Sequence, residues 1–485
     1  MNTMPQRVKP KRSYKTRAIA SQVVATPSSV TPVNPATAYK DPLLRLLRRT
    51  SYGLVPDQIA KAQQMGFSAY LEYQLNPAAI DDGLMDVELK RSFPVIFDTP
   101  RQLEAVDGWI VHEQLVQSTL WRQAYSQKQL FERMVEFWSN HFNVFIDKVG
   151  SQMKAYEDRT VIRPYALDTF PNLLKATAHS AAMLTMLDND PNSGSNPNQN
   201  YGRELMELHT LGVHGGYTQQ DVINVARCFT GWSYQWQGTD THYGMFLFNP
   251  DDHDNAEKVV LQHHLMPGGG QQDGETVLQI LAAHPSTALH ISTKMLQWLL
   301  NYNPPQTLIE QIANVYLQTK GDIKSMLRAI LTPTNLLASP AKYKPPSHMF
   351  VSALRALDPT VSDLGSFEWD YLGNTDNIPF EWAPPNGYPD AAGYWAGYIL
   401  PRWNFALNLM SDGVYGMMVD INALAGLATD MNSIVDRINT LIFGGEMLAE
   451  DKVELIRFLR AKPIDEDRIR AAFALAIASP SFQWY

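Results

Sequence analysis

The sequence has few of the features that usually reveal function or location. It contains one cysteine, Cys228, so no disulfide can form within the chain. It has no run of eighteen apolar residues, which argues against a transmembrane helix. It also lacks the glycine-rich phosphate loops, the Gly-x-Ser-x-Gly turn and the Cys-x-x-Cys pair. Nucleotide-binding, serine-hydrolase and thiol-redox functions therefore lose their usual support.

The composition is that of a large folded protein with an unusual N-terminus. The chain has 485 residues, of which 45% are apolar and 18% charged, and its net charge of −9 argues against a nucleic-acid partner. Residues 1–20 hold six Lys or Arg and no acid, and residues 21–40 lack the apolar block of a secretory signal. We therefore expect residues 1–40 to form a disordered basic arm. With no recognisable signal peptide the compartment stays unknown, and the cytoplasm is the default.

Hydrophobic spacing predicts a mainly α fold, as one large helical domain over residues 41–485. Asp41-Pro42 is typical of a helix start, because Asp caps the first turn and Pro is favoured at its first position. A second helix is expected from Pro171 to about Leu187. The pattern over 101–145 is helical, and in its second half one stripe has three- and four-residue spacing: Leu130, Met134, Phe137, Trp138, His141 and Phe145.

Two segments depart from this helical pattern. Phe246-Leu247-Phe248 and Lys258–Leu261 predict the short strands of a minor β-hairpin, with Asp251–Asp254 at its polar tip. Residues 365–400 form an irregular segment with nine aromatic side chains. Aromatic faces in such a loop either stack on sugars or peptides, or form a lid over the helical core.

Several segments, taken in order, resemble the mostly bacterial family catalogued as domain of unknown function 1800. They are LLRRTSYG (46–53), MVEFWSNHFNV (134–144), LDNDPNSGSNPNQNYGRELMELHTLGV (187–213), YTQQDVINVARCFTGW (217–232), FLFNPDDHDNAEKVVL (246–261), PPNGYPDAAGYW (384–395) and ASPSFQ (478–483). The resemblance covers about residues 41–485 and implies a helical fold; many relatives look exported, and no reaction is implied. The chain departs from the family pattern at Gln199, where relatives have Glu, and at Gly387-Tyr388-Pro389, where they often have Lys-Gly-Trp.

The segment Asn198–Trp232 is the densest in ionisable side chains and predicts two helices joined by a glycine-bracketed turn. Glu204 and Glu207 are three residues apart, so both carboxylates project from one helix face. Such a pair can hold a metal or act as acid and base. It can also be neutralised, and we expect a buried unit in which Arg203 or Arg227 pairs with one of the glutamates.

His141 and an Asp-rich loop are further candidates with two interpretations each. His141 is either a hydrogen-bonded core residue or a base or ligand that reaches the Glu204 helix from across the core. Asp188, Asp190 and Asn192 alternate as in a calcium loop, but the turn glycine, Gly194, is one position late and Gln199 replaces the last glutamate. The alternative is a surface loop rich in Asp and Asn.

The Asp251–Asp254 segment, with His253, brings three carboxylates and an imidazole into four residues. Mutual repulsion requires that they be solvated, paired or bound to a cation. We expect this segment to fold back beside the N-terminal end of the Tyr201–Leu211 helix, where the Asn-rich loop before Tyr201 offers free amides that would offset its charge. The candidate metal ligands are then Asp252, Asp254, Asp188 and Asp190.

Two functional hypotheses remain. The first is a non-catalytic binding or assembly protein with a polar central cleft, whose partner is a polysaccharide, a peptide or another protein. The alternative is a metal-assisted hydrolase of a polymer or glycan, which uses a divalent cation, Glu204, Glu207 and the Asp251–Asp254 loop. His141 or His253 would then act as the base. Convergence of these carboxylates around an open pocket favours the enzyme, whereas separate pairing of each favours the binding protein.

Overall fold

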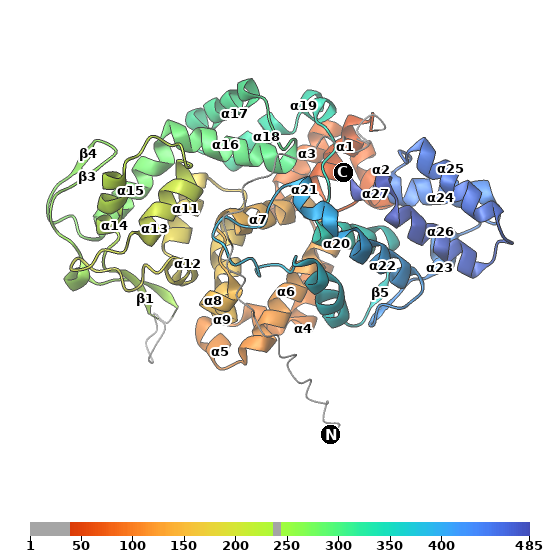
Figure 1. The fold of residues 1–485 in the computed structure, drawn as a ribbon, viewed down its shortest axis with the longest axis horizontal. Coiled ribbons are helices and arrows are strands. Elements are labelled where there is room, and N and C mark those ends of the chain that lie inside the picture. The colour runs from red at the N-terminus through yellow and green to blue at the C-terminus, as the bar shows by residue number, and fades with distance from the viewer. Residues whose placement is uncertain (1–38, 236–243) are drawn as a thin grey trace. The chain divides into compact units, whose positions relative to one another are not determined.

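The computed structural model describes residues 39–235 and 244–485, and the expected basic arm lies almost entirely outside this range. The described residues belong to one compact unit made mainly of helices, as the sequence predicts (Figure 1). The first helix begins as expected, since the Asp41 carboxylate accepts from the Leu43 amide at 2.8 Å and Pro42 occupies the first turn. No described helix is long and apolar enough to cross a membrane.

The helices bury two separate apolar cores. Those that contribute to the first core are α1 (Pro42–Thr50), α2 (Pro56–Met65), α3 (Phe67–Leu75), α7 (Gln129–His141), α11 (Phe170–Ala178), α12 (Ala181–Met186), α13 (Gln199–Glu204), α14 (Gln219–Cys228), α15 (Gln271–Ala283), α16 (Pro285–Leu299), α17 (Gln306–Thr319), α18 (Ile323–Ile330) and α19 (Pro333–Ala338).

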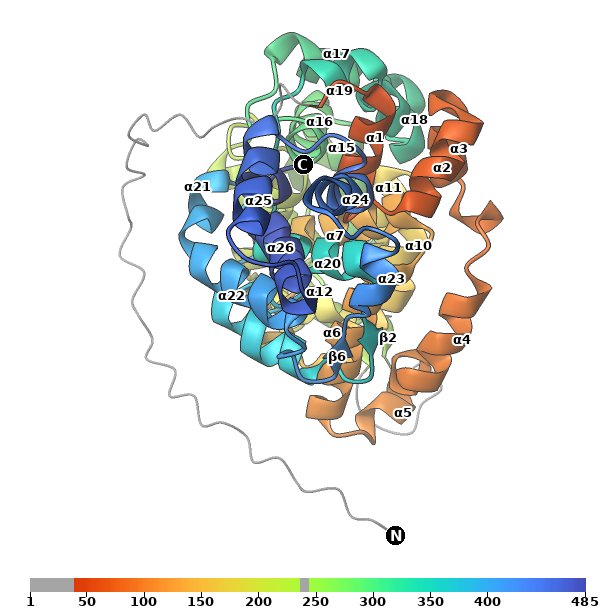
Figure 2. The ribbon, with the colours of Figure 1, turned by 90° about the vertical axis from the view of Figure 1, so that its right-hand side faces the viewer.

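The second core is formed by helices from two parts of the chain. They are α4 (Gly83–Ser92), α5 (Pro100–Glu104), α6 (Gly108–Tyr125), α9 (Ser151–Glu157), α20 (Pro346–Leu357), α22 (Ile399–Met410), α23 (Ile421–Ala425), α24 (Met431–Phe443), α25 (Ala449–Arg460), α26 (Glu466–Ala478) and α27 (Pro480–Gln483). Every residue of α20 is buried. Around it, α26 packs against α22, α24 and α25 (Figure 2).

Short helical segments connect these elements. Three short α-helices are α8 (Ile146–Val149), α10 (Arg163–Tyr165) and α21 (Ala392–Trp395). Three π-helical turns are η4 (Asp158–Ile162), η5 (Leu205–Thr210) and η7 (Phe367–Leu372). The 3-10 turns are η2 (Pro77–Ala79), η3 (Pro94–Phe97), η6 (Pro250–Asp252), η8 (Gly373–Thr375) and η9 (Ala396–Tyr398). Segments of π-helix are rare and frequently occur at functional sites.

The predicted strands exist, but their predicted pairing is wrong. β2 (Met245–Phe248) pairs with β1 (Trp232–Gln235), and β3 (Lys258–Val260) pairs with β4 (His263–Leu265), both antiparallel. A third pair is β5 (Thr360–Val361) with β6 (Met417–Met418). The β3–β4 hairpin closes through Leu261 and Gln262, whose φ angles of 47° and 67° fit a tight two-residue turn. Neither residue is Gly or Asn, so the usual sequence signal for this turn is missing.

Candidate functional site

Helix α7 presents an apolar face and a polar face, and the polar face is the side that the sequence analysis overlooked. Its apolar stripe packs in the first core, as the spacing predicts. On the opposite side of the helical wheel lies a polar stripe at three- and four-residue steps: Glu132, Glu136, Ser139 and Asn140, with Asn143 just beyond the helix end. This stripe faces residues of α6, α20 and the irregular segment that precedes α21.

These elements enclose a polar pocket where helices of the two cores meet, which we call the Glu136 pocket. Its lining residues are Thr119, Gln123, Glu132, Val135, Glu136, Ser139, Asn140, Asn143, Ser347, Asn377, Pro379, Phe380 and Tyr388. The pocket offers water about 40 Å³, which is room for roughly two or three ordered waters or one small polar group. Most of its lining side chains are hydroxyls, amides and carboxylates, with two aromatic rings among them.

Glu136 is the one carboxylate of this pocket that uses only one of its two oxygens in hydrogen bonds with described residues. Its Oε2 atom accepts from the Tyr52 hydroxyl at 2.7 Å and from Arg133 Nη1 at 2.8 Å. No described residue bonds Oε1. Burial raises the pKa of Glu136, although Arg133 and the Tyr52 hydroxyl act in the opposite direction. The side chain is therefore held rigidly, with one oxygen free to accept a hydrogen bond from a ligand.

Ser139 adds a second unused group to the same pocket. Its hydroxyl is buried and has no hydrogen-bond partner among residues 39–235 and 244–485. Buried polar groups in folded proteins are almost always satisfied, so an orphaned hydroxyl that lines a pocket requires an explanation. A ligand or ordered water that bonds Ser139 supplies one.

The loop that closes the pocket is held against the end of α7 and the residues that follow it. Asn143 Nδ2 donates to the carbonyl oxygens of Trp382 and Pro384 at 2.7 and 2.8 Å. Gly387 packs so closely that a Cβ built on it would lie 2.1 Å from the Asn140 oxygen. Phe380 has a φ angle of 70°, which is an outlier for a bulky residue and is typical of strain held at a functional site.

Glu132, the other carboxylate of the pocket, is fully engaged elsewhere. Its two oxygens accept from Arg163 Nη1 and Nη2 at 3.0 and 2.9 Å, and Arg163 Nε donates to Asp158 at 2.9 Å. All three side chains are buried or nearly so. Burial acts to raise the pKa of Asp158, but Arg163 and other cations outweigh it and lower that pKa. This triad is a structural ion network, so Glu136 alone offers a carboxylate oxygen to the pocket.

The two glutamates singled out in the sequence lie on a different part of the fold. Glu204 ends α13, and Glu207 lies in the π-turn η5; both are half-buried. The expected pairing with arginine is wrong, because Arg203 donates to Gln219 at 3.1 Å and Arg227 to Asp254 at 2.6 Å. Burial, followed by the Glu207 charge, raises the pKa of Glu204. The capping box of Thr218 and Asp221, in contrast, is present at the start of α14.

His141 does reach the Glu204 helix across the core, but through the main chain. Its Nε2 lies 3.1 Å from the carbonyl oxygen of His209. The rings of Phe142 and Trp138 pack edge-on against the imidazole. Burial holds the pKa of His141 well below its usual range. These contacts are those of a core histidine, and they lie on the α7 face opposite Glu136.

The Asp251–Asp254 segment is a 3-10 turn followed by an extended stretch, and it is not a hairpin tip. As expected, it lies against the Asn-rich loop: the Gly194 amide donates to the Asp252 carbonyl oxygen at 2.7 Å. His253 is buried, with Nδ1 at 2.8 Å from the Thr230 oxygen and Nε2 at 3.2 Å from Asp273. The carboxylate of Asp254 is already paired with Arg227.

Asp188 has similar local partners. Lys148 Nζ lies 2.8 Å from its Oδ1, and Asn200 Nδ2 donates to its Oδ2 at 3.1 Å. Asp190 is exposed. Throughout the described ranges, no three His, Cys, Asp or Glu side chains are grouped so that they could hold a metal ion. The candidate ligands Asp188, Asp190, Asp252 and Asp254 thus lie in two neighbouring segments without forming such a group.

A second buried carboxyl, Glu368, lies beside the histidine of α6. His112 Nε2 is 3.8 Å from Glu368 and 3.3 Å from Glu381, and Gln117 donates to Glu368 at 3.1 Å. Burial raises the pKa of Glu368 well above its usual range. A raised folded-state pKa gives stability that is complete below the unfolded value, about 4.3, and is lost as the pH rises.

We therefore expect Glu368→Gln to stabilise the protein at pH 8 but not at pH 4. The amide keeps the shape and accepts from Gln117, while it removes the cost of ionising a buried carboxyl. The gain at pH 8 should be at least about 1 kcal/mol, since one pKa unit corresponds to about 1.4 kcal/mol. Urea unfolding of both proteins at the two pH values measures it. An equal difference at pH 4 and pH 8 would contradict the argument.

Fold and pocket together define a mainly helical protein with a preformed polar pocket between two apolar cores. The family model described as "Protein of unknown function (DUF1800)" matches residues 45–484, so the chain belongs to that family. No curated protein and no solved structure matches the chain. Three of the segments that carry the family resemblance meet at the Glu136 pocket: 46–53 through Tyr52, 134–144 on α7, and 384–395 through Tyr388.

Proposed function

We propose that this protein is a non-catalytic binding protein that holds a hydroxyl-bearing group of a neutral sugar or similar polyol in the Glu136 pocket. The observation that supports it is the pair of unused groups on α7, Glu136 Oε1 and Ser139 Oγ. A carboxylate oxygen accepts from a sugar hydroxyl, and a serine hydroxyl both donates and accepts. The aromatic residues Phe380 and Tyr388 line the same pocket.

Binding is favoured over hydrolysis because the pocket offers a single free carboxylate. Most glycoside hydrolases use two carboxyl groups that flank the bond to be cleaved. Here both oxygens of Glu132 accept from Arg163. The metal-assisted alternative gains no support either, because Asp254 pairs with Arg227 and Asp188 with Lys148 and Asn200.

The proposal predicts that Glu136→Gln weakens sugar binding by about 10- to 100-fold, since a hydrogen bond to a charged group contributes about 1.5–3 kcal/mol. Ser139→Ala should weaken it by roughly fivefold, as expected for a neutral hydrogen bond of about 1 kcal/mol. Titration calorimetry with a panel of neutral mono- and oligosaccharides measures these affinities.

Glu450→Gln is the matched control, because Glu450 is exposed on α25 and away from the pocket. It should bind as the wild type does, and circular dichroism should show that all variants are folded. Absence of binding by every sugar of the panel would contradict the proposal. Equal affinity of Glu136→Gln and the wild type would contradict it as well.

A further inference from the structure

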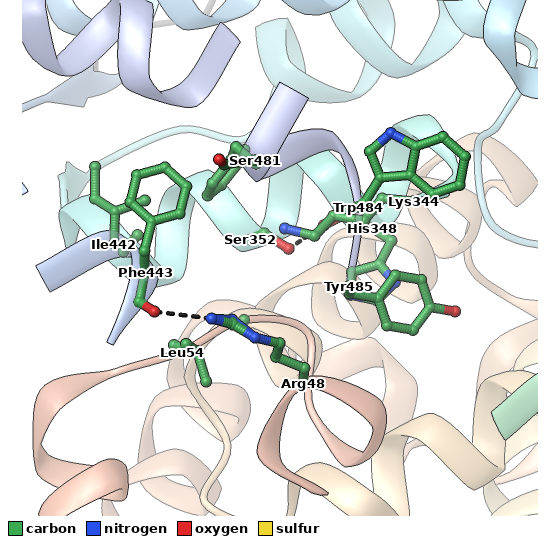
Figure 3. A pocket seen from close by; sticks show the side chains of 13 residues that line it. Arg48, Leu54, Lys344, His348, Ser352, Ile442, Phe443, Ser481, Trp484 and Tyr485 are labelled. Carbon is green, nitrogen blue, oxygen red and sulfur yellow. Dashed lines mark hydrogen bonds between the residues drawn. The ribbon is translucent and has the colours of Figure 1, made fainter. Parts of the chain in front are cut away.

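A second, smaller pocket lies among elements distant in the sequence (Figure 3). We call it the Lys344 pocket, and its lining residues are Arg48, Gly53, Leu54, Lys344, His348, Ser352, Ala356, Ile442, Phe443, Ser481, Phe482, Trp484 and Tyr485. It offers water about 20 Å³, which accommodates roughly one water-sized particle. The pocket is separate from the Glu136 pocket, and its residues have no part in the proposed sugar binding.

The lining of this pocket contains two cationic side chains and no acidic side chain. Lys344 is 6% exposed, and its ammonium lies 3.9 Å from the centre of the Phe482 ring. No described residue accepts a hydrogen bond from that ammonium. A buried ammonium without an acceptor is costly, and burial together with Arg48 and Arg402 holds the pKa of Lys344 well below its usual range.

Two other polar side chains of the pocket, Arg48 and His348, also have nitrogens without hydrogen-bond partners among the described residues. Arg48 donates through Nη2 to the Phe443 carbonyl oxygen at 2.8 Å and to Glu446 at 3.2 Å, but its buried Nε has no partner in the described chain. His348 is 1% exposed and neither of its ring nitrogens has a partner. Arg48 Nε and the two ring nitrogens of His348 are thus three buried nitrogens without partners in residues that line one cavity. Native structures rarely leave so many buried polar atoms unsatisfied.

We propose that the Lys344 pocket is a binding site for one small inorganic anion of about the size of chloride. Such an ion accepts hydrogen bonds from several N–H donors at once and supplies a counter-charge to the Lys344 ammonium. The cavity volume favours a monatomic ion over phosphate or sulfate. The Ser352 hydroxyl is not counted among the donors to the ion, because it already donates to the His348 carbonyl oxygen at 2.7 Å.

Binding is coupled to protonation, since the ammonium of Lys344 must be charged to hold the anion. The charged groups around Lys344 are Arg48 and Arg402, and Glu446 faces Arg48. His348 faces Lys344, the rings of Tyr52 and Tyr485, and the cations Arg133, Arg402 and Arg49. An anion offsets this surplus of positive charge and favours proton uptake, so its affinity rises as the pH falls.

The test uses the full chain in chloride-free buffer with sodium gluconate, into which sodium chloride is exchanged at constant ionic strength. The unfolding temperature should rise with chloride and saturate, and the half-saturating concentration should be at least tenfold lower at pH 6 than at pH 9. Lys344→Met should abolish the response, while Lys462→Met, at an exposed position, should keep it. Crystals grown in bromide should show one anomalous peak beside Lys344.

Four results would overturn the proposal. One is an unfolding temperature that does not respond to chloride in the wild type. Another is an equal response in Lys344→Met and the wild type. If Lys344→Met does not fold, the bromide crystals decide, and absence of a peak in the pocket refutes the site. A larger effect of phosphate than of chloride would equally refute an ion of this size.

Discussion

Arg163→Met should lower the free energy of unfolding by about 3–5 kcal/mol, the cost of removing one partner from a buried ion network. The substitution leaves Glu132 and Asp158, each with a side chain only 4% exposed, without the guanidinium that donates to both. Urea unfolding at pH 7 measures the loss. The deficit should shrink as the pH falls, because Arg163 helps to lower the pKa of Asp158 and the stability that this gives is lost on acidification through that lowered pKa.

Arg457→Met is the matched control for this prediction. Arg457 pairs with Glu454 at 3.0 Å, but both side chains are largely exposed, at 72% and 61%. Exposed pairs contribute little to stability, so this variant should unfold close to the wild type. A loss below about 1 kcal/mol for Arg163→Met would show that the triad is more solvated than its contacts indicate.

Gly387→Ala should cost about 3 kcal/mol and release the loop that closes the Glu136 pocket. Gly387 has a φ angle of 72°, which L-residues rarely adopt, and its Cβ would overlap the Asn140 oxygen. Thermal unfolding measures the cost, and titration with a sugar that binds the wild type measures the effect on the pocket. Both stability and affinity should fall together.

Gly393→Ala separates this effect from a general glycine effect. Gly393 lies in α21, and a Cβ added there meets nothing within 4 Å. Alanine favours helix, so this variant should be as stable as the wild type or slightly more stable. A Gly387→Ala protein with unchanged stability and sugar affinity would show that the loop does not depend on this close approach.

The helical fold could be predicted from the sequence because it depends on local patterns. Apolar spacing predicts α7, and Asp41-Pro42 predicts the start of α1, both as observed. Strand pairing depends on contacts between distant residues, and here the pairing prediction failed. Nothing local indicates that β2 pairs with β1 across the residues between them, or that Leu261 and Gln262 form the turn of another hairpin.

The candidate site was harder to predict, and the reason is physical. In the sequence, Glu136 follows Arg133 by three residues, a spacing that is typical of an ordinary ion pair on a helix surface. Its role depends on Tyr52 and on the loop that contains Tyr388, which only the tertiary fold brings together. The one usable signal was the polar stripe itself, opposite the apolar stripe of α7. Conversely, among the described residues of 198–254, Arg227 pairs with Asp254, whereas Arg203 bonds Gln219 and neither Glu204 nor Glu207 pairs with an arginine.

The central claim is that Glu136 Oε1 and Ser139 Oγ bind a ligand hydroxyl, and a crystal structure of the protein with a sugar from the binding panel tests it most directly. We expect a sugar hydroxyl within about 3 Å of Glu136 Oε1, the usual hydrogen-bond distance, and a second contact with Ser139. A sugar bound elsewhere on the protein, with only water in the Glu136 pocket, would contradict it.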